Sequence, residues 1–480
     1  MLQAFIYYAI LYHSFMKSQE RSRSMTEEKT MQKENKMGVM PINKLLITMS
    51  LPIMISMLVQ AMYNIVDSIF VGRLSESALT AVSMAFPIQS LMIAFGSGTA
   101  VGINAYLSRN LGEKNFEQAD AAALNGIFLA FLTYIVFALF GLFGSRFFFA
   151  AQIDDPVIVR YGIDYLTICT VVSIGLFMQM TMERLLQSTG KTIYTMITQG
   201  TGAIINIIFD PILIFGLSGF PRMEVAGAAA ATVLGQCVAA VMALLFNLKR
   251  NHELHFHFHK FRPDGHIIGQ IYKVGIPSII MQSVVSVMTL LMNKILLMFS
   301  STAVSVFGVY FKLQSFVFMP VFGLNNGMIP IVAYNYGAQK RKRILDTYKL
   351  STMIAVGIML AGFAVFQIFP AALIRLFNDS PHMVSIGVPA LRTISFSFIF
   401  AGACIVSSAM FQALGNGFYS LIIALVRQIF IIVPVAYIFA GIFGLDAVWY
   451  AFPIAEIGSI LLCIYFFRKT YMKQLKNIPN

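Results

Sequence analysis

Long apolar runs separated by short polar loops fill the chain from residue 44 to residue 467. Most runs hold about 20 or more mainly apolar residues, enough to cross a hydrocarbon core of about 30 Å. A backbone in lipid must satisfy its own hydrogen bonds, which favours helices. We predict twelve membrane-spanning helices, near Lys44–Val71, Ala78–Leu107, Ala119–Phe143, Val157–Met182, Ile193–Leu217, Val225–Leu248, Ile267–Met298, Ala303–Ala333, Thr347–Phe369, Val384–Met410, Phe418–Phe443 and Ala447–Phe467.

The composition fits this pattern. Hydrophobic residues make up 58% of the chain and charged residues 11%, and the mean hydropathy is +0.76. These values predict an all-α integral membrane protein, with no soluble domain between Met40 and Tyr471. The net charge of +13 would suggest a nucleic-acid partner for a soluble protein. Here the basic residues fall mostly in short loops, so we expect no nucleic-acid partner.

The first 43 residues form a predicted N-terminal extension. The apolar stretch Met1–Met16 is too short to span a membrane, and no basic residue precedes it. No small-residue cleavage pattern follows it, so a signal peptide is not expected. The polar segment Lys17–Lys44 is predicted to be a cytoplasmic tail. A translation start at Met25 or later is an alternative explanation of the unusual beginning.

Basic residues set the expected orientation. Most of the 34 Lys and Arg residues fall in the two tails and in alternate loops. The opposite set of loops holds only Arg73, Arg146, Arg160, Arg222 and Arg375. Because cytoplasmic loops carry the excess of Lys and Arg, we predict a plasma-membrane protein with both termini in the cytoplasm.

The two halves of the chain repeat each other at a spacing of 225 residues. Ten identities fall at this one spacing, mostly of Gly and Pro. They are Pro52 with Pro277, Gly98 with Gly323, Gly102 with Gly327, Asn110 with Asn335, Gly112 with Gly337, Pro156 with Pro381, Gly162 with Gly387, Gln187 with Gln412, Gly190 with Gly415 and Tyr194 with Tyr419. The alternative is a chance match in a chain rich in Gly and Pro.

Each repeat contains six predicted crossings, so both halves enter the membrane from the same side. We predict two six-helix bundles, related by a pseudo-twofold axis along the membrane normal, with a central cavity that opens alternately to each side. The expected divisions are an extension at 1–43, a first bundle at 44–248, a cytoplasmic linker at 249–266, a second bundle at 267–467 and a cytoplasmic tail at 468–480.

Three acids interrupt apolar segments of the first half. At the repeat spacing Asp67 corresponds to Met292 and Glu183 to Ser408, while Asp210 before Pro211 corresponds to Val433 before Pro434. We expect acids in the first half only. An ionisable side chain at membrane depth is expensive and usually functional, so we predict that the first half carries the cation chemistry.

Helical spacing groups polar residues with these acids. Gln60, Asn64 and Asp67 share one face of the first helix, and the fifth helix carries a similar stripe of Thr195, Gln199, Gly202, Asn206 and Asp210. Two such stripes can converge on one site. Asp67, Asn206 and Asp210 offer hard oxygen ligands for Na⁺, or two carboxylates that can share a proton.

A structural alternative stands beside this hypothesis. Asp67 could pair with Arg73 near a helix end, and Asp210 could pair with Arg222. Glu183 lies next to Arg184, and its place in the cavity is open. Met178 and the neighbouring methionines could form an adaptable wall for varied substrates.

Other features carry weaker hypotheses. Histidines at 252, 255, 257 and 259 are better explained by a solvated linker than by a metal site, and Cys169, Cys237, Cys404 and Cys463 predict neither a disulfide nor a zinc site. Lys294, Lys312, Arg392 and Arg427 could hold the bundles together, face lipid headgroups or contact substrate. No nucleotide-binding loop supports ATP-driven transport.

Several short stretches resemble one known family. They are Tyr63-Asn-Ile-Val-Asp67-Ser-Ile-Phe-Val-Gly72-Arg with Pro52 fifteen residues before Asp67, Leu186-Gln-Ser-Thr-Gly190, and Asn206-Ile-Ile-Phe-Asp210-Pro-Ile-Leu-Ile-Phe-Gly216. With the plan of two times six helices, they resemble the multidrug and toxic compound extrusion (MATE) family, in particular its bacterial MepA-type subgroup. The resemblance covers nearly everything after Met40.

The resemblance implies a secondary antiporter, not an enzyme, that exports cationic amphipathic compounds in exchange for H⁺ or Na⁺ and needs no cofactor. Asp67 matches the family's first-helix acid near a proline bend, here Pro52. Asn206 and Asp210 match its fifth-helix pair, and Thr232 is a looser match on the sixth helix. Glu183 resembles an acid of the MepA-type subgroup. The implied substrate-contacting residues are Gln60, Asn64, Asp67, Met178, Glu183, Gln199 and Asp210.

Second-half cation sites of the family use acids on the seventh and tenth helices. The seventh helix here carries Gln282, Ser286, Thr289 and Asn293 instead, which points to the first half. We expect a monomer in the lipid bilayer with cationic small molecules as partners. Two alternatives remain, a lipid-linked precursor flippase of the wider superfamily and an integral-membrane enzyme.

Overall fold

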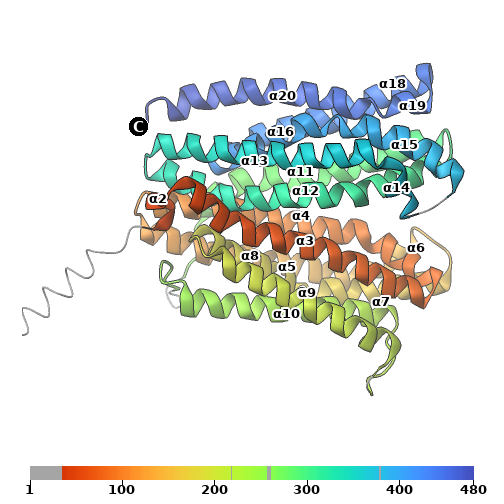
Figure 1. The fold of residues 1–480 in the computed structure, drawn as a ribbon. Coiled ribbons are helices and arrows are strands. Elements are labelled where there is room, and N and C mark those ends of the chain that lie inside the picture. Colours follow the sequence, from red (N-terminus) through yellow and green to blue (C-terminus); the bar gives the residue numbers. More distant parts are fainter. Residues whose placement is uncertain (1–34, 218, 257–260, 378–379, 480) are drawn as a thin grey trace, which may run out of the picture.

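The computed structural model describes residues 35–217, 219–256, 261–377 and 380–479, which form a bundle of long, roughly parallel helices (Figure 1). Met1–Met16, His257 and His259 lie outside this described part. Ten described helices are long and apolar enough to span a membrane, and two further spans arise when each of two bent helix pairs counts as one. The described helices therefore fit the predicted number of twelve crossings.

The first half of the chain forms one side of the bundle, which we call the first lobe (Figure 1). Its helices are α3 (Ile42–Leu74), α4 (Glu76–Gly112), α5 (Phe116–Phe143), α6 (Ser145–Ala150), α7 (Pro156–Val171), α8 (Ile174–Ser188), α9 (Thr192–Phe215) and α10 (Val225–Arg250). A short helix, α2 (Lys36–Val39), precedes them.

The second half forms the opposite side, the second lobe (Figure 1). Its elements are α11 (Gly265–Leu297), α12 (Ser301–Gly337), α13 (Arg341–Ile368), α14 (Pro370–Arg375), α15 (Pro381–Ser395), α16 (Phe398–Ala413), α17 (Gly417–Leu425), the π-helix η2 (Val426–Ile432), α18 (Val433–Phe443), α19 (Leu445–Val448), α20 (Ala451–Thr470) and the π-helix η3 (Tyr471–Leu475).

Local signals repeat between the lobes. The hydroxyl of Ser75 accepts a hydrogen bond from the backbone N–H of Ala78 and caps α4, and Ser300 caps α12 through Ala303 in the same way. These residues are also 225 positions apart. The repeat therefore includes the signals that start its helices.

Two predicted spans are broken rather than straight. The fourth consists of α7 and α8, which meet at 42°, and the tenth consists of α15 and α16, which meet at 51°. The eleventh contains the π-helical stretch η2 between α17 and α18. Hydrophobic periodicity locates such spans but does not reveal where a helix changes direction.

The repeated glycines lie where the two lobes meet. Helix α3 packs on α12, and α4 packs on α11. A Cβ at Gly98 would lie 2.8 Å from the backbone nitrogen of Ile279, and a Cβ at Gly323 would lie 2.6 Å from Cα of Met54. Met54 and Ile279 are themselves 225 residues apart, so one contact is the symmetry copy of the other.

The same symmetry holds at two further positions. A Cβ at Gly102 would meet the carbonyl oxygen of Ile271 at 2.1 Å, and one at Gly327 would meet Cα of Ser50 at 2.8 Å. At the helix ends, a Cβ at Gly112 would lie 1.9 Å from the Tyr334 carbonyl oxygen. Its counterpart at Gly337 would lie 2.1 Å from that of Arg109. The lobes approach so closely that only glycine fits.

Helix α2 joins the two lobes at the end of the bundle where the C-terminus also lies (Figure 1). We call this end the terminal face. Asn35 donates hydrogen bonds to the carbonyl of Thr189, 3.4 Å away, and to the side chain of Glu253. From the second lobe, Arg343 donates to the carbonyl oxygens of Met37 and Met40, at 2.9 and 2.7 Å.

This contact is dry, since Met37 is fully buried. Asn335 also donates to the Met37 carbonyl, and Lys340 donates to that of Gly38. Burial lowers the pKa of the Lys36 ammonium group. Residues 35–40 were predicted to belong to a solvated tail, but they strap one lobe to the other.

The glycine contacts predict how the interface tolerates substitution. We expect Gly323→Ala to destabilise the protein by about 1–3 kcal/mol, because its methyl group meets Met54 backbone. Gly308→Ala is the control on the same helix, since its Cβ meets nothing within 4 Å. Thermal unfolding in detergent measures the difference. Equal unfolding midpoints for the two variants would contradict the close lobe contact.

Candidate functional site

Asp67 on α3 and Asp210 on α9 come together inside the first lobe. The two helices pack against each other, and the carboxyl groups are hydrogen-bonding neighbours. Asp210 is fully buried, and Oδ1 of Asp67 is buried without a hydrogen-bond partner. Two bare carboxylates in contact repel each other, so this arrangement requires a proton or a cation between them.

Asn206 and Thr232 complete this acidic centre. In the amide orientation that satisfies both of its ends, Asn206 donates to Oδ2 of Asp210 at 3.2 Å and accepts from the Thr232 hydroxyl at 3.1 Å. Asn206 lies one turn before Asp210 on α9, and Thr232 comes from α10. The four oxygen-bearing side chains therefore come from three helices.

Aromatic and amide side chains lie around this centre. The Tyr63 hydroxyl hydrogen-bonds with Gln60 and lies close to both Asp67 and Asp210. Gln89 on α4 donates to the hydroxyl of Tyr165 on α7 at 3.0 Å, and Tyr165 is also a neighbour of Asp67. The sequence interpretation gave Tyr63, Gln89 and Tyr165 no role, although each is a polar group inside an apolar run.

The ion-pair alternative fails within the described residues, where no Lys or Arg side chain forms a salt bridge with Asp67 or Asp210. Arg222 pairs with Glu224 at 3.4 Å instead, and Arg73 is exposed. The acidic centre therefore keeps its negative charge unless a proton or a cation binds.

Pro52 lies in a continuous α3 rather than at a break. Proline at this position leaves the carbonyl of Thr48 without its usual intrahelical donor. The hydroxyl of Thr192 on α9 donates to that carbonyl at 3.2 Å, and the Ser56 hydroxyl donates to the Pro52 carbonyl at 2.9 Å. The role of Pro52 as a bending point stays a prediction. The side chain of Asn64 lies outside the described part.

Glu183 forms a second, separate centre between α8 and α9. Its Oε1 accepts hydrogen bonds from Gln179 at 3.0 Å and Thr198 at 2.8 Å, and its Oε2 accepts one from Gln199 at 2.6 Å. Gln199 lies eleven residues before Asp210, which is about 16 Å along a helix. The predicted stripe on α9 thus serves two sites rather than one.

The residue beside Glu183 reaches the other lobe. Arg184 donates from Nη1 to Gln187 and to Asn326 of α12, each at 3.0 Å. Ser97 and Gln282 also hydrogen-bond across the lobes. Glu183 therefore lies next to the interface that must change if the lobes move. Met178 packs against the apolar cluster of Met92, Phe137 and Phe177, and its contact with substrate stays a prediction.

The expectation of acids in the first half only is wrong. Glu456 on α20 is buried and forms a salt bridge with Arg427 of η2, at 2.9 Å between Oε1 and Nη1. Arg427 therefore contacts neither a bundle partner across the interface nor a headgroup. Lys294, Lys312 and Arg392 have exposed side chains.

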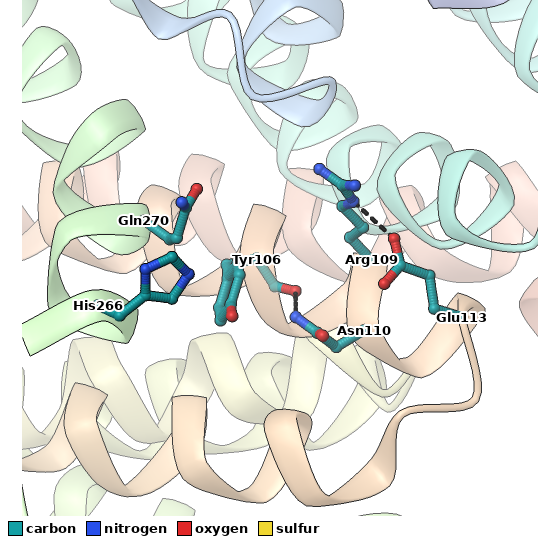
Figure 2. Close-up of a pocket in the computed structure, with 6 residues that line it drawn as sticks. All are labelled: Tyr106, Arg109, Asn110, Glu113, His266 and Gln270. Carbon is teal, nitrogen blue, oxygen red and sulfur yellow. Dashed lines mark hydrogen bonds and ion pairs between the residues drawn. The ribbon is translucent and has the colours of Figure 1, made fainter. Parts of the chain in front are cut away.

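A polar pocket lies at the terminal face, away from both acidic centres. Figure 2 shows it between the last turns of α4 and the first turns of α11. Its volume is about 220 Å³, and it is lined by Tyr106, Arg109, Asn110, Glu113, His266 and Gln270. Arg109 pairs with Glu113 at 2.8 Å. None of the predicted site residues lines it.

The linker histidines converge on no metal site in the described part of the chain, where no three His, Cys, Asp or Glu side chains form a cluster suited to a metal ion. His255 instead contacts Asp120 of α5, with 3.8 Å between Nδ1 and Oδ2.

The MatE family model matches residues 52–212 and 277–438, which are most of both lobes. This chain belongs to the MATE family. The two matched segments also agree with the internal repeat read from the sequence. Members of the family are multidrug transporters and not enzymes, and this member is a multi-pass membrane protein.

Named relatives place this MATE protein with the MepA type. It is 28% identical to the multidrug export protein MepA of Staphylococcus haemolyticus (strain JCSC1435), over 88% of this chain and 93% of the relative. It is 27% identical to MepA of Staphylococcus aureus (strain bovine RF122 / ET3-1), over 89% of this chain and 94% of the relative.

Solved structures agree on the fold. A multidrug resistance MATE family transporter in an outward-facing conformation matches with a TM-score of 0.87 and 25% identity, over 93% of this chain and 99% of that one. A MOP superfamily transporter from Pyrococcus furiosus Vc1, whose binding pocket is described as having reverse polarity, matches with a TM-score of 0.86 and 25% identity, over 92% of this chain and 99% of that one.

The hydrogen bonds of Glu183 predict a graded response in this MATE protein. Glu183→Leu leaves three buried donors without an acceptor, at about 1–3 kcal/mol for each. Glu183→Gln keeps one acceptor oxygen and should unfold between Glu183→Leu and the wild type. Thermal unfolding in detergent gives the order, and a Glu183→Leu protein as stable as the wild type would contradict the described network.

Proposed function

We propose that this protein is a secondary antiporter that exports cationic amphipathic compounds in exchange for H⁺ or Na⁺. The observation that supports it most is the pair of adjacent carboxyl groups of Asp67 and Asp210 without a basic partner among the described residues. Such a centre binds one positive charge strongly, and it does not specify whether the charge is on a small ion or a large one.

Exchange follows from competition for this centre. A proton or Na⁺ on Asp67 and Asp210 removes the negative field that a cationic substrate needs, so the substrate leaves. Asn206 and Thr232 supply further oxygen ligands for Na⁺, while Gln60, Tyr63 and Gln199 supply polar contacts along the same helices. Coupling requires only that ion and substrate prefer the same acids to different degrees in two conformations.

Alternating access gives the exchange its direction. The lobes meet at the terminal face through the glycine contacts and the strap of residues 35–40. We propose that this face is cytoplasmic, as the excess of Lys and Arg there indicates, and that both termini lie on that side of the plasma membrane. Substrate released from the opposite side then leaves the cell. A single chain contains the whole acidic centre, which favours a working monomer.

The flippase alternative has less support. A pyrophosphate-bearing lipid would need basic groups facing the central cavity. Lys294, Lys312 and Arg392 are exposed, and Arg427 is paired with Glu456. The only buried charge of the first lobe's centre is negative, which suits a cation.

The central test is charge removal at constant shape. We expect Asp67→Asn and Asp210→Asn each to reduce export of a fluorescent cation from everted vesicles to background, because the remaining acid can no longer exchange a substrate for an ion. Asp446→Asn, at an exposed acid, is the matched control and should export like the wild type.

Imposing Na⁺ and pH gradients separately on vesicles that contain the purified protein identifies the coupling ion. Export at the wild-type rate by either Asp67→Asn or Asp210→Asn, at equal membrane content, would refute the assignment.

A further inference from the structure

The second lobe contains its own buried acid, and that acid already holds a cation. Glu456 and Arg427 lie 2.9 Å apart, with 8% and 23% of their side-chain surfaces exposed. The salt bridge joins α20 to η2. Arg427 lies in the first turn of this π-helical stretch, a kind of local irregularity often found at functional sites.

The acid is only half used. Oε2 of Glu456 is buried and accepts no hydrogen bond. The guanidinium group has five N–H donors, of which one is donated to Glu456 and none to another described residue. A pair optimised only for stability would satisfy both carboxylate oxygens, as a bidentate Arg–carboxylate contact does.

The surroundings of Glu456 suit a cation. Tyr310 of α12 is a neighbour of both charged groups, and its ring lies 6.0 Å from that of Phe452, one turn before Glu456. The thiols of Cys404 and Cys463 are the other neighbouring ionisable groups. A carboxylate with aromatic rings is a combination that binds organic cations. In this chain the Arg427 guanidinium fills that role.

The position also matches the acidic centre of the first lobe. Helices α10 and α20 align at a spacing of 224 residues, which places the buried positions Ala231, Gly235 and Ala239 on Ala455, Ser459 and Cys463. At this spacing Thr232 corresponds to Glu456. The second lobe therefore places an acid where the first lobe places a member of its centre.

We propose that Arg427 is the resident cation of the second lobe, which closes Glu456 to Na⁺, protons and cationic substrates and so confines exchange to the first lobe. The statement about exchange rests on the proposed function, whereas the occupation of Glu456 does not. The first centre carries two acids without a base, and the second carries one acid with one base. A free cation therefore gains energy in the first lobe only.

Cation counting on purified protein tests the proposal. Bound Na⁺ is measured by equilibrium dialysis and bound protons by potentiometric titration, for the wild type, Arg427→Gln, Arg427→Lys and the double variant Arg427→Gln/Glu456→Gln. We expect Arg427→Gln to bind one more Na⁺ or proton per chain than the wild type. Arg427→Lys keeps the resident charge, and the double variant lacks the acid, so both should show no gain.

The same count in an Asp67→Asn/Asp210→Asn background separates this proposal from the proposed function. The extra cation should persist there, whatever the first lobe does in transport. A folded Arg427→Gln protein with the wild-type number of cations in both backgrounds overturns the proposal.

A second variant covers the case in which Arg427→Gln does not fold. Arg427→Ala leaves room for a free guanidinium group, so methylguanidinium during purification should restore a monodisperse protein, and urea at the same concentration should not. Recovery with methylguanidinium supports the proposal, and no recovery overturns it.

Discussion

The contact between the carboxyl groups of Asp67 and Asp210 is the constraint on which the first lobe depends. Two acids in a mainly apolar bundle cannot both remain charged and unpartnered, so a positive charge has to share the space. The surrounding residues fit this demand, since Asn206 and Thr232 add oxygen atoms and the nearby arginine, Arg222, is held by Glu224. An acidic pair without a base is costly in a structural role but useful in an exchanger.

The scaffold is symmetric where packing decides and asymmetric where charge decides. Gly98, Gly102 and Gly112 meet the other lobe as their counterparts in α12 do, because close approach of two backbones leaves no alternative residue. The charged positions follow no such rule. Asp67 corresponds to Met292, while Glu456 corresponds to Thr232 and is neutralised by Arg427. Similar lobes can therefore differ in function while they keep a common interface.

Sequence patterns predicted the spans and the acidic centre because both depend on local order. Apolar run length identified the twelve crossings, and helical spacing placed Asn206 on the face of Asp210. The same spacing included Gln199, which instead binds Glu183, because a stripe along a helix does not show where one site ends. Glu456 was missed because the repeat shifts by one residue before α20. The strap at Met37 depends on Arg343 and Asn335, about 300 residues later, which no local pattern reveals.

Ion release on substrate binding tests the competition at Asp67 and Asp210 most directly. Purified protein in a weakly buffered solution is mixed with a fluorescent organic cation, while a pH indicator and a Na⁺ electrode follow the medium. We predict release of H⁺ or Na⁺ in proportion to the bound dye, and weaker dye binding as the concentration of the released ion rises. Dye binding of equal affinity at every pH and Na⁺ concentration, without ion release, would contradict a shared acidic centre.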